Sequence, residues 1–462
     1  MTGLRKILNS GRRLCLCACL TGSLTAGTAA AQSLPELYMQ ALAKDPAVIG
    51  AEAQLRAAEQ RRVQALAAFG PSAAVTGNYN DTRYREAPAY EKRDFSDKQL
   101  NFRVTQPLLR SELFPAFDSA EAQVQQAQAK VDQARAETAQ RLVEACFEAL
   151  KARDALELVR AQRVSTVEQL ALAQKSFKTG MAPIVDVREA EAKADAVAAQ
   201  VSAAEFDLDL KLQIVTELTG QSAAALLRRG LDGKQLPSLQ AADGASQWLT
   251  AAQGNSAQLR QAQQALASAE AEVRKAWQGH APTLDLTYTY GHSSDTGTYL
   301  TSMPRRGNSS AVGVSLNIPL FASGATQAKV NEARAMRDKA QSDVNAALRT
   351  VNLDVRQNVS ATLSAISQAH GLETAVRSQE LALRANRRGY EVGMKVNAEV
   401  LDSQSRLFEA RRDLSRARYD AWVGYIKLKA LTGRVDDSDI QSLDTMLVPV
   451  TQVELLPARQ TR

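Results

Sequence analysis

The sequence predicts a mainly α-helical chain that also carries four β-strands, which close into a membrane β-barrel only when several copies share them. Three observations predict this fold. Long proline-free runs, rich in alanine and charged residues, occupy residues 116–182 and the residues after 322. Four shorter segments alternate apolar and polar side chains with the period of a strand that has one buried face. The whole pattern occurs twice, at an offset of 211 to 213 residues.

The first 31 residues have the layout of a secretory signal. A basic start is followed by an apolar stretch and by three alanines that end at Ala31, where we expect cleavage. An alternative is a lipoprotein acylated at Cys19, one of the cysteines inside the apolar stretch. After cleavage Cys146 is the single remaining cysteine, so no intrachain disulfide can form and stability must come from packing or assembly.

The basic character of the full sequence comes largely from this N-terminal segment. The chain has 56 Lys and Arg against 50 Asp and Glu, and the segment holds four of the basic residues and none of the acidic ones. The mature balance is 52 against 50, or +2, so the sequence pI of about 9.1 does not indicate nucleic acid as a partner. Beyond the signal the sequence has no run of about 18 apolar residues, which excludes a membrane-spanning helix.

The duplication is visible in four pairs of motifs that recur in the same order. The pairs are FGPSAAVTGNY with GHAPTLDLTYT, TQPLL with NIPLF, SFKTGM with GYEVGM, and LTG at 218–220 with LTG at 431–433. We therefore divide the chain into the signal (1–31), a first repeat (32–220), a linker (221–245), a second repeat (246–433) and a C-terminal tail (434–462).

Each repeat begins with a helix of about 25 residues and continues with a pair of strands. The helices are expected at 46–68 and 255–278, and each is followed by a proline. The strands are expected at 72–82, 99–106, 283–290 and 310–318. The polar segments between paired strands, 81–97 and 292–308, are expected to be exposed loops at the tips of the hairpins.

After each pair of strands the sequence predicts a very long helix, from 116 to 182 and from 322 through the second repeat. Sixty-odd residues at 1.5 Å per residue make a rod of roughly 90 to 100 Å, which is too long for a globular core. Glycines interrupt both runs, at Gly180 in the first and at Gly389 and Gly393 in the second. We expect the rods to turn inwards at these glycines and to narrow the structure there.

Four strands with one apolar face cannot form a barrel by themselves, because the smallest membrane barrels have about eight strands and lipid does not tolerate an open sheet edge. Three copies would supply twelve strands. The polar face would then line an aqueous lumen with the side chains of Asp285, Thr287, Thr289, Ser315 and Asn317. Helical rods that continue from the barrel would extend this lumen away from the membrane on one side.

The second repeat contains four motifs in this order: GHAPTLDLTYTYG, SLNIPLFASG, GYEVGMKVNAEVLD and ARYDAWVGYIKLKALTG. With these motifs the chain resembles the TolC family of outer-membrane channel-tunnels, and the resemblance covers nearly all of residues 35–435. The resemblance implies a homotrimer with a twelve-stranded barrel in the outer membrane of a Gram-negative bacterium. It also implies a tunnel of twelve long coiled helices through the periplasm. Such a protein is the exit duct for an inner-membrane transporter and a periplasmic adapter.

The resemblance leaves the exported cargo open. We expect type I secretion of a protein with an ABC transporter, because the GHxPTLDLT form of the motif resembles that branch of the family. The alternative is an outer-membrane channel for multidrug efflux, which uses the same duct. A more distant alternative is a soluble periplasmic coiled-coil adapter, and the four amphipathic strands argue against it.

The resemblance also implies a latch that closes the periplasmic entrance. Asp186 matches the position that accepts a bond from the tyrosine matched by Tyr390, and Lys395 stands where the family's reference member has an arginine. The lysine keeps the charge without the planar fork of a guanidinium. Val185 departs from the family, which offers a hydroxyl at this position, so part of the latch is expected to be missing or replaced.

Glu399 and Asp402 match the two aspartates that ring the narrowest point of the family's tunnel. Their spacing alone supports this role, because residues three apart share a helix face and threefold symmetry would gather six carboxylates around one axis. Carboxylates this close repel one another and attract cations. The alternative is an ordinary solvated helix face, on which Glu391 and Lys395 form a surface pair.

No catalytic or metal-binding pattern is present in the sequence. The histidines His280, His292 and His370 are scattered, and the sequence contains no HExxH motif, no phosphate-binding GxxxxGK loop and no serine-centred elbow. We therefore expect a protein that is not an enzyme and that carries no cofactor.

Overall fold

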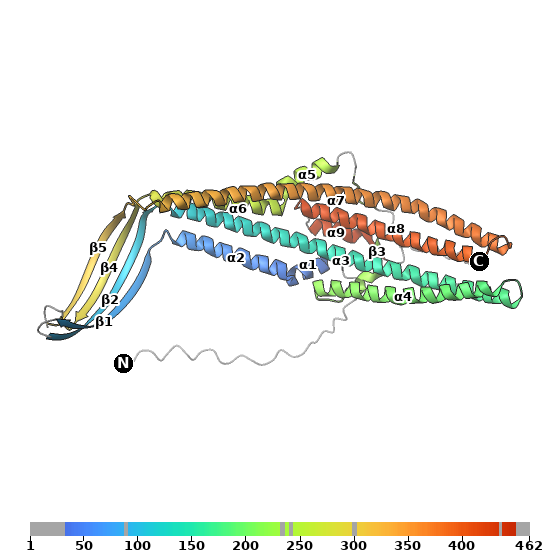
Figure 1. Ribbon diagram of the computed structural model, residues 1–462, viewed down its shortest axis with the longest axis horizontal. Coiled ribbons are helices and arrows are strands. Elements are labelled where there is room, and N and C mark those ends of the chain that lie inside the picture. The colour runs from blue at the N-terminus through green and yellow to red at the C-terminus, as the bar shows by residue number, and fades with distance from the viewer. Residues whose placement is uncertain are drawn as a thin grey trace, which may run out of the picture.

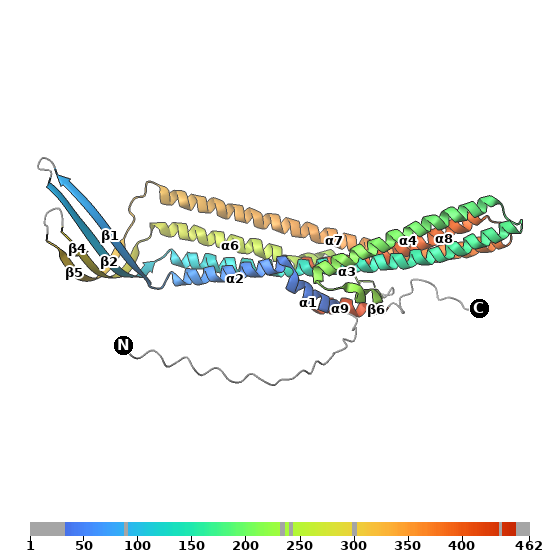
Figure 2. The ribbon, with the colours of Figure 1, turned by 90° about the horizontal axis from the view of Figure 1, so that it is seen from below.

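The computed structural model describes residues 33–86, 91–231, 236–239, 244–297, 303–433 and 437–449. The predicted signal and the alternative acylation site at Cys19 lie outside the described residues. The described chain is elongated, with a sheet at one end and helices along the rest of its length (Figures 1 and 2).

Both repeats contain the same elements in the same order. The first has α2 (Pro46–Ala67), β1 (Ser72–Glu86), β2 (Glu91–Arg110), α3 (Leu113–Lys178) and α4 (Ile184–Thr219), and the second has α6 (Ala257–Trp277), β4 (Thr283–Asp295), β5 (Arg305–Asn317), α7 (Ala325–Glu391) and α8 (Asn397–Leu431). The helices α3 and α7 contain 66 and 67 residues, which corresponds to about 100 Å each.

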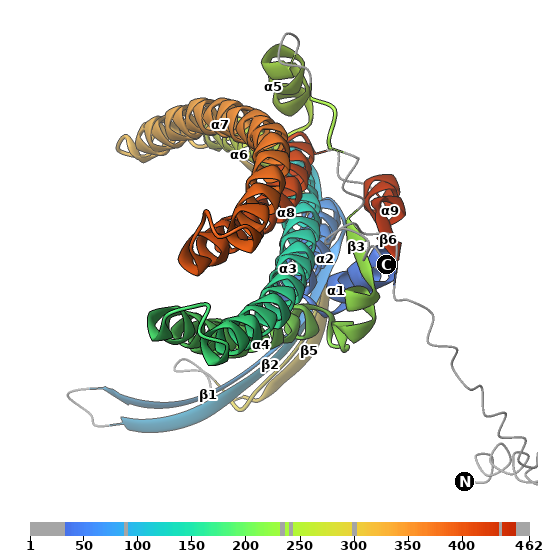
Figure 3. The ribbon, with the colours of Figure 1, turned by 90° about the vertical axis from the view of Figure 1, so that its right-hand side faces the viewer.

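The long helices form one curved wall. The shorter helices α2 and α4 pack end to end along α3, and α6 and α8 pack in the same way along α7. Contacts of α3 with α6 and α8 join the two repeats. Viewed from the end opposite the sheet, the helices follow an arc with a concave side (Figure 3). The buried side of α3 is rich in alanine, including Ala120, Ala127 and Ala134, which lets its neighbours approach closely.

The four strands form one antiparallel sheet in the order β1-β2-β4-β5. β1 and β5 are the two edges of this sheet: among the described residues β1 pairs only with β2 and β5 only with β4, so the four strands of one chain do not close on themselves. The register aligns Val104 with Tyr288, and Tyr288 with Val312, on one face. It aligns Thr105 with Thr287 on the other face. The sheet therefore has one apolar and one polar face, as the alternation of residues predicts.

The strands extend beyond the predicted bounds. β2 runs for 20 residues and β1 for 15, so most of the segment 81–97 is strand and the expected exposed loop is wrong. In 292–308 the strands take only the two ends of the segment, because β4 ends at Asp295 and β5 begins at Arg305, so the expected loop is shorter than predicted. The reason is that backbone pairing continues through polar residues once two strands are aligned, and the pattern of apolar side chains does not report it.

A second prediction that requires correction is the continuous helix through the second repeat. α7 ends at Glu391, and the chain reverses into α8 instead of narrowing an unbroken rod. The first long helix likewise ends at Lys178 and reverses into α4. Each interruption is therefore the turn of a helical hairpin.

A small mixed subdomain surrounds the middle of the helices on the convex side of the wall (Figure 3). It contains α1 (Leu34–Lys44), η1 (Ala223–Arg228), β3 (Arg229–Leu231), α5 (Gly244–Asn255), α9 (Asp437–Met446) and β6 (Leu447–Pro449). The segments predicted as linker and tail meet here, because β3 pairs with β6. Arg229 strengthens this contact with an ion pair to Asp444, at 2.6 Å between Nη1 and Oδ1.

The largest apolar core lies where this subdomain meets α3 and α8. Phe147 of α3 and Tyr419 of α8 are fully buried there, with ring centroids 5.5 Å apart. Burial, and secondly the Asp154 carboxylate, raise the pKa of Tyr419, so its hydroxyl remains protonated and donates to Asp154 Oδ2 at 3.2 Å. Ser415 donates to the same oxygen at 2.9 Å. Cys146 is fully buried in this core, and burial raises the pKa of its thiol to about 12.

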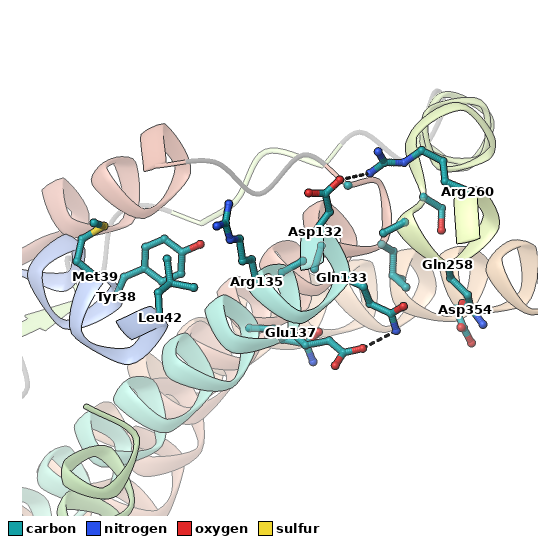
Figure 4. A pocket seen from close by; sticks show the side chains of 17 residues that line it. Tyr38, Met39, Leu42, Asp132, Gln133, Arg135, Glu137, Gln258, Arg260 and Asp354 are labelled. Carbon is teal, nitrogen blue, oxygen red and sulfur yellow. Dashed lines mark hydrogen bonds and ion pairs between the residues drawn. The ribbon is translucent and has the colours of Figure 1, made fainter. Parts of the chain in front are cut away.

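A pocket of about 730 Å³ opens beside this core, between α1, α3 and the junction of α5 and α6. Figure 4 shows Tyr38 of α1 on one side and Arg260 of α6 on the other, with Asp132 of α3 between them. Arg260 and Asp132 form an ion pair across the pocket at 3.1 Å.

Candidate functional site

The turns of the two helical hairpins lie together at the end of the molecule opposite the sheet (Figures 1 and 2). Both turns have the same backbone design. Gly180 and Gly393 have φ of 74° and 75°, a left-handed conformation that glycine adopts without steric cost. In the second turn the Met394 N–H donates to the Gly389 carbonyl at 2.8 Å, and the Gly393 N–H donates to the Tyr390 carbonyl at 3.0 Å. This pair of bonds is the Schellman pattern that ends a helix.

Gly389 has a different role from Gly393. It lies inside the last turn of α7, and a Cβ atom there would lie 2.7 Å from Cγ of Lys395. The absent side chain therefore leaves space for the aliphatic part of Lys395, which folds back over the end of α7. Gly389 positions Lys395, and Gly393 reverses the chain.

Lys395 binds Glu399, with Nζ 2.5 Å from Oε2. Glu399 lies in the first turn of α8, where the helix dipole favours a carboxylate. Glu391 pairs with Arg388 at 3.0 Å, so the Glu391–Lys395 surface pair of the alternative interpretation is wrong. An i,i+4 pair needs one continuous helix, and the chain turns between these two residues.

Asp402 lies one turn further along α8 and pairs with Arg406, with 3.0 Å between Oδ2 and Nη2. Its side chain is exposed. Glu399 and Asp402 therefore project from adjacent turns of α8, close to the tip of the hairpin. Each carboxylate already has a cation beside it within the chain, which weakens the mutual repulsion expected from spacing alone.

The other predicted latch residues are near the tips but are not joined by hydrogen bonds. Asp186 lies in the first turn of α4, and its half-buried carboxylate has no hydrogen bond or ion pair within the described part of the chain. The Tyr390 ring packs against Leu383 and Val400, and its hydroxyl has no hydrogen bond to any described residue. The structure of one chain thus brings Lys395 and Glu399 together but does not join Asp186 to Tyr390 or Lys395. Val185 is exposed beside Asp186.

Sequence reasoning missed a polar contact between α3 and α8, directly behind the tips. Asn397 is fully buried, and its Oδ1 accepts a hydrogen bond from Gln169 of α3. Gln404, seven residues along α8, is 2% exposed, and neither of its amide atoms has a hydrogen-bond partner within the described residues. Thr166 of α3 is also buried. We call Thr166, Gln169, Asn397 and Gln404 the polar seam, and the spacing of seven between two amides on α8 is the signal that could have revealed it.

The described residues contain no group of side chains suited to bind a metal ion. Among them no helix is both long and apolar enough to cross a membrane.

Comparisons with known proteins identify the family. The family described as outer membrane efflux protein matches residues 37–221 and again residues 248–434. Outer membrane protein TolC of Vibrio cholerae is 31% identical over 422 residues, which cover 90% of this chain and 94% of the relative. The proteases secretion protein PrtF of Dickeya chrysanthemi is 25% identical over 431 residues, covering 91% and 92%.

The fold is also found among solved structures. The outer membrane protein VceC of Vibrio cholerae superimposes with a TM-score of 0.72 at 19% identity, over 87% of this chain and 96% of that protein. Family members are channels and not enzymes, they form trimers, and they work with periplasmic adapters and inner-membrane transporters. The chain therefore belongs to the outer membrane efflux protein (TolC) family, with its strands in a shared trimeric barrel in the Gram-negative outer membrane and its helices in a periplasmic tunnel.

Proposed function

We propose that this channel is the exit duct of a type I secretion system, in which an ABC transporter and a periplasmic adapter deliver a protein cargo to its helical end. The similarity to PrtF supports this choice, because a protein named for the secretion of proteases matches nearly the whole chain. The alternative is small-molecule efflux, which the name of the family supports.

We also propose that the duct has a gate at the end of its helices. This proposal is supported by the position of both hairpin turns at one end of the helical wall, with Glu399 and Asp402 beside the second turn. In a trimer, three copies of these turns would surround one axis. The end of the helices would then be the entrance of the duct, and its side chains would decide when the duct is open.

The latch that we propose uses Asp186, Tyr390 and Lys395. Asp186 has no partner within the described part of the chain, so its carboxylate is available to a donor at the entrance. Lys395 is held by Glu399 in the single chain. Closing the latch would transfer Lys395 from Glu399 to an Asp186 at the entrance, and Tyr390 would donate its hydroxyl to the same carboxylate. Lys395 can exchange between the Glu399 and Asp186 carboxylates at a small cost in free energy, because both ion pairs are partly exposed to solvent.

The cation ring that we propose uses Glu399 and Asp402. When Lys395 moves from Glu399 to Asp186, the net charge of the entrance is unchanged, but the Glu399 carboxylate becomes free and the negative charge of the ring is no longer compensated by Lys395. The closed state would therefore bind cations more strongly than the single chain suggests.

Removal of the gene in its own host tests the cargo. Loss of one or more proteins from the culture medium, restored by the gene on a plasmid, is the result expected for type I secretion. Unchanged secreted proteins together with greater sensitivity to small toxic compounds would reject secretion in favour of efflux. A tip variant that folds but exports nothing serves as the control for indirect effects on the envelope.

A further inference from the structure

A row of polar and cationic side chains crosses the sheet on its apolar face. The register places Tyr79, Lys98, Ser294 and Arg306 side by side on β1, β2, β4 and β5. We call these four residues the upper row. Side chains alternate between the two faces of a strand, so the upper row shares its face with Leu100, two residues from Lys98.

A second row lies next to it on the same face, one step nearer to the helices. Here the register aligns Leu100 with His292, and His292 with Asn308. Nδ1 of His292 lies 2.6 Å from Oδ1 of Asn308. Neither row contains an acidic residue. Asp81 belongs to the next row beyond the upper row, and Asp94 belongs to the row after that, both farther from the helices.

The two cations of the upper row are available to a ligand. Lys98 and Arg306 are both exposed and form no ion pair within the described part of the chain. Lys98 lies over the ring of Tyr79, with Nζ 5.6 Å from the ring centroid. The strands of Lys98 and Arg306 are separated by β4, so their backbones are about 10 Å apart, with Ser294 between them.

The position of the upper row along the barrel follows from the apolar residues. On this face the large apolar residues begin with Leu284 and Leu316 near the helices and end with Leu100, which is aligned with His292. From 284 to 292 a strand advances about 27 Å, or roughly 20 Å perpendicular to the membrane at the usual strand tilt. This is close to the apolar band of about 25 Å in membrane barrels. The upper row therefore lies at the boundary between hydrocarbon and headgroups.

The upper row lies at the boundary between hydrocarbon and headgroups in the outer leaflet of the membrane. The helices occupy the periplasm, so the end of the strands away from the helices reaches the outside. At the periplasmic end of the strands, Arg110 is aligned with Thr283 on the polar face and forms a forked pair with Asp285 of the same face, with contacts of 3.0 and 2.8 Å. A cation beside hydrocarbon is costly unless an anion pairs with it, and neither cation of the upper row forms an ion pair within the described chain.

We propose that the upper row, with His292 and Asn308 beside it, binds a phosphate group of lipid A, the anionic anchor of lipopolysaccharide in the outer leaflet. An arginine holds phosphate with two parallel hydrogen bonds, and a lysine adds a point charge. Ser294 and His292 supply further polar contacts between the two cations. A trimer would carry three such sites on its lipid-facing surface.

Binding of lipid A to the purified trimer, measured by native mass spectrometry in detergent, tests the site. The double substitution Lys98→Gln with Arg306→Gln is expected to weaken binding of bisphosphorylated lipid A by about tenfold for each cation removed. Arg305→Gln is the matched control, because Arg305 is adjacent to Arg306 on β5 but belongs to the opposite face. It is expected to leave binding unchanged.

Two further measurements keep the test decisive if the double variant does not form trimers. Dephosphorylated lipid A is expected to bind the unchanged trimer at least about tenfold more weakly, and Lys98→Arg with Arg306→Lys is expected to retain binding. Equal loss with Arg305→Gln, or equal binding of dephosphorylated lipid A, would overturn the site. Displacement of lipid A by the same concentration of phosphatidylglycerol or inorganic phosphate would overturn the assignment to lipid A.

Discussion

Gln404→Leu is expected to strengthen the contact between α3 and α8 behind the entrance. The side chain of Gln404 is 2% exposed, and both amide atoms lack a hydrogen-bond partner within the described residues. A buried polar group without a partner costs about 1–3 kcal/mol, and leucine fills a similar volume without this cost. The substitution should therefore stabilise the seam by roughly 2 kcal/mol.

Amide hydrogen exchange of residues 397–407 in the trimer measures this effect. A stabilisation of roughly 2 kcal/mol corresponds to exchange that is about 30-fold slower where these amides open locally. Gln404→Ala is the control, because it removes the same amide but leaves a cavity that offsets the gain. If Gln404→Leu exchanges as fast as the unchanged protein or faster, the amide has a hydrogen-bond partner such as a buried water, and the reasoning fails.

Three other predictions concern the entrance and the core. Tyr390→Phe combined with Asp186→Ala should raise the single-channel conductance in planar bilayers, because the proposed latch loses a donor and its acceptor. Glu399→Ala combined with Asp402→Ala should abolish the block of the channel by multivalent cations, measured in the same bilayers. Cys146 should make unfolding easier in alkali, because burial raises the pKa of its thiol from 9.0 to about 12 in the folded protein. Its contribution to the free energy of unfolding is therefore fully present below pH 9. Between pH 9 and about pH 12 the free energy of unfolding falls by about 1.4 kcal/mol per pH unit.

Each of these predictions has a control. Glu391→Ala removes a carboxylate at the same hairpin tip, where Glu391 pairs with Arg388, and it should change neither conductance nor block. Unchanged conductance of the Tyr390 and Asp186 double variant would reject the latch, and unchanged cation block without Glu399 and Asp402 would reject the ring. For the core, denaturant unfolding between pH 8 and 11 is compared with Cys146→Ala; parallel curves would show that the thiol contributes nothing to the pH dependence.

Several elements were predictable because their signals are local in the sequence. The helix predicted at 46–68 is α2, Pro46–Ala67, because a proline can begin a helix and another proline soon follows its end. The four strands were found because alternation of residues such as Leu284 and Asp285 depends only on the pleat. Strand length was not predictable, since pairing with the neighbouring strand extends a strand through polar residues.

The sequence predicted which residues lie at the candidate site, but it did not predict which of them contact one another. The motif GYEVG located the turn, and Glu399 and Asp402 do project from adjacent turns of one helix. The partner of Lys395 was not predictable from spacing, because Glu391 and Glu399 are both four residues away and the turn at Gly393 separates only one of them from Lys395. The polar seam was missed because the buried Asn397 is bonded to Gln169 of α3, more than 200 residues earlier in the chain.

The sequence by itself determined that this chain has two similar repeats, long helices, and four strands with one apolar face, because periodicity, proline and glycine act within a few residues. Only the tertiary structure decided where the chain reverses its long helices into hairpins, which carboxylate holds Lys395, and which cations share a row on the barrel. Those outcomes depend on contacts between segments far apart in the chain, and the free energy of such contacts is set by the space and the partners that the fold brings to each side chain.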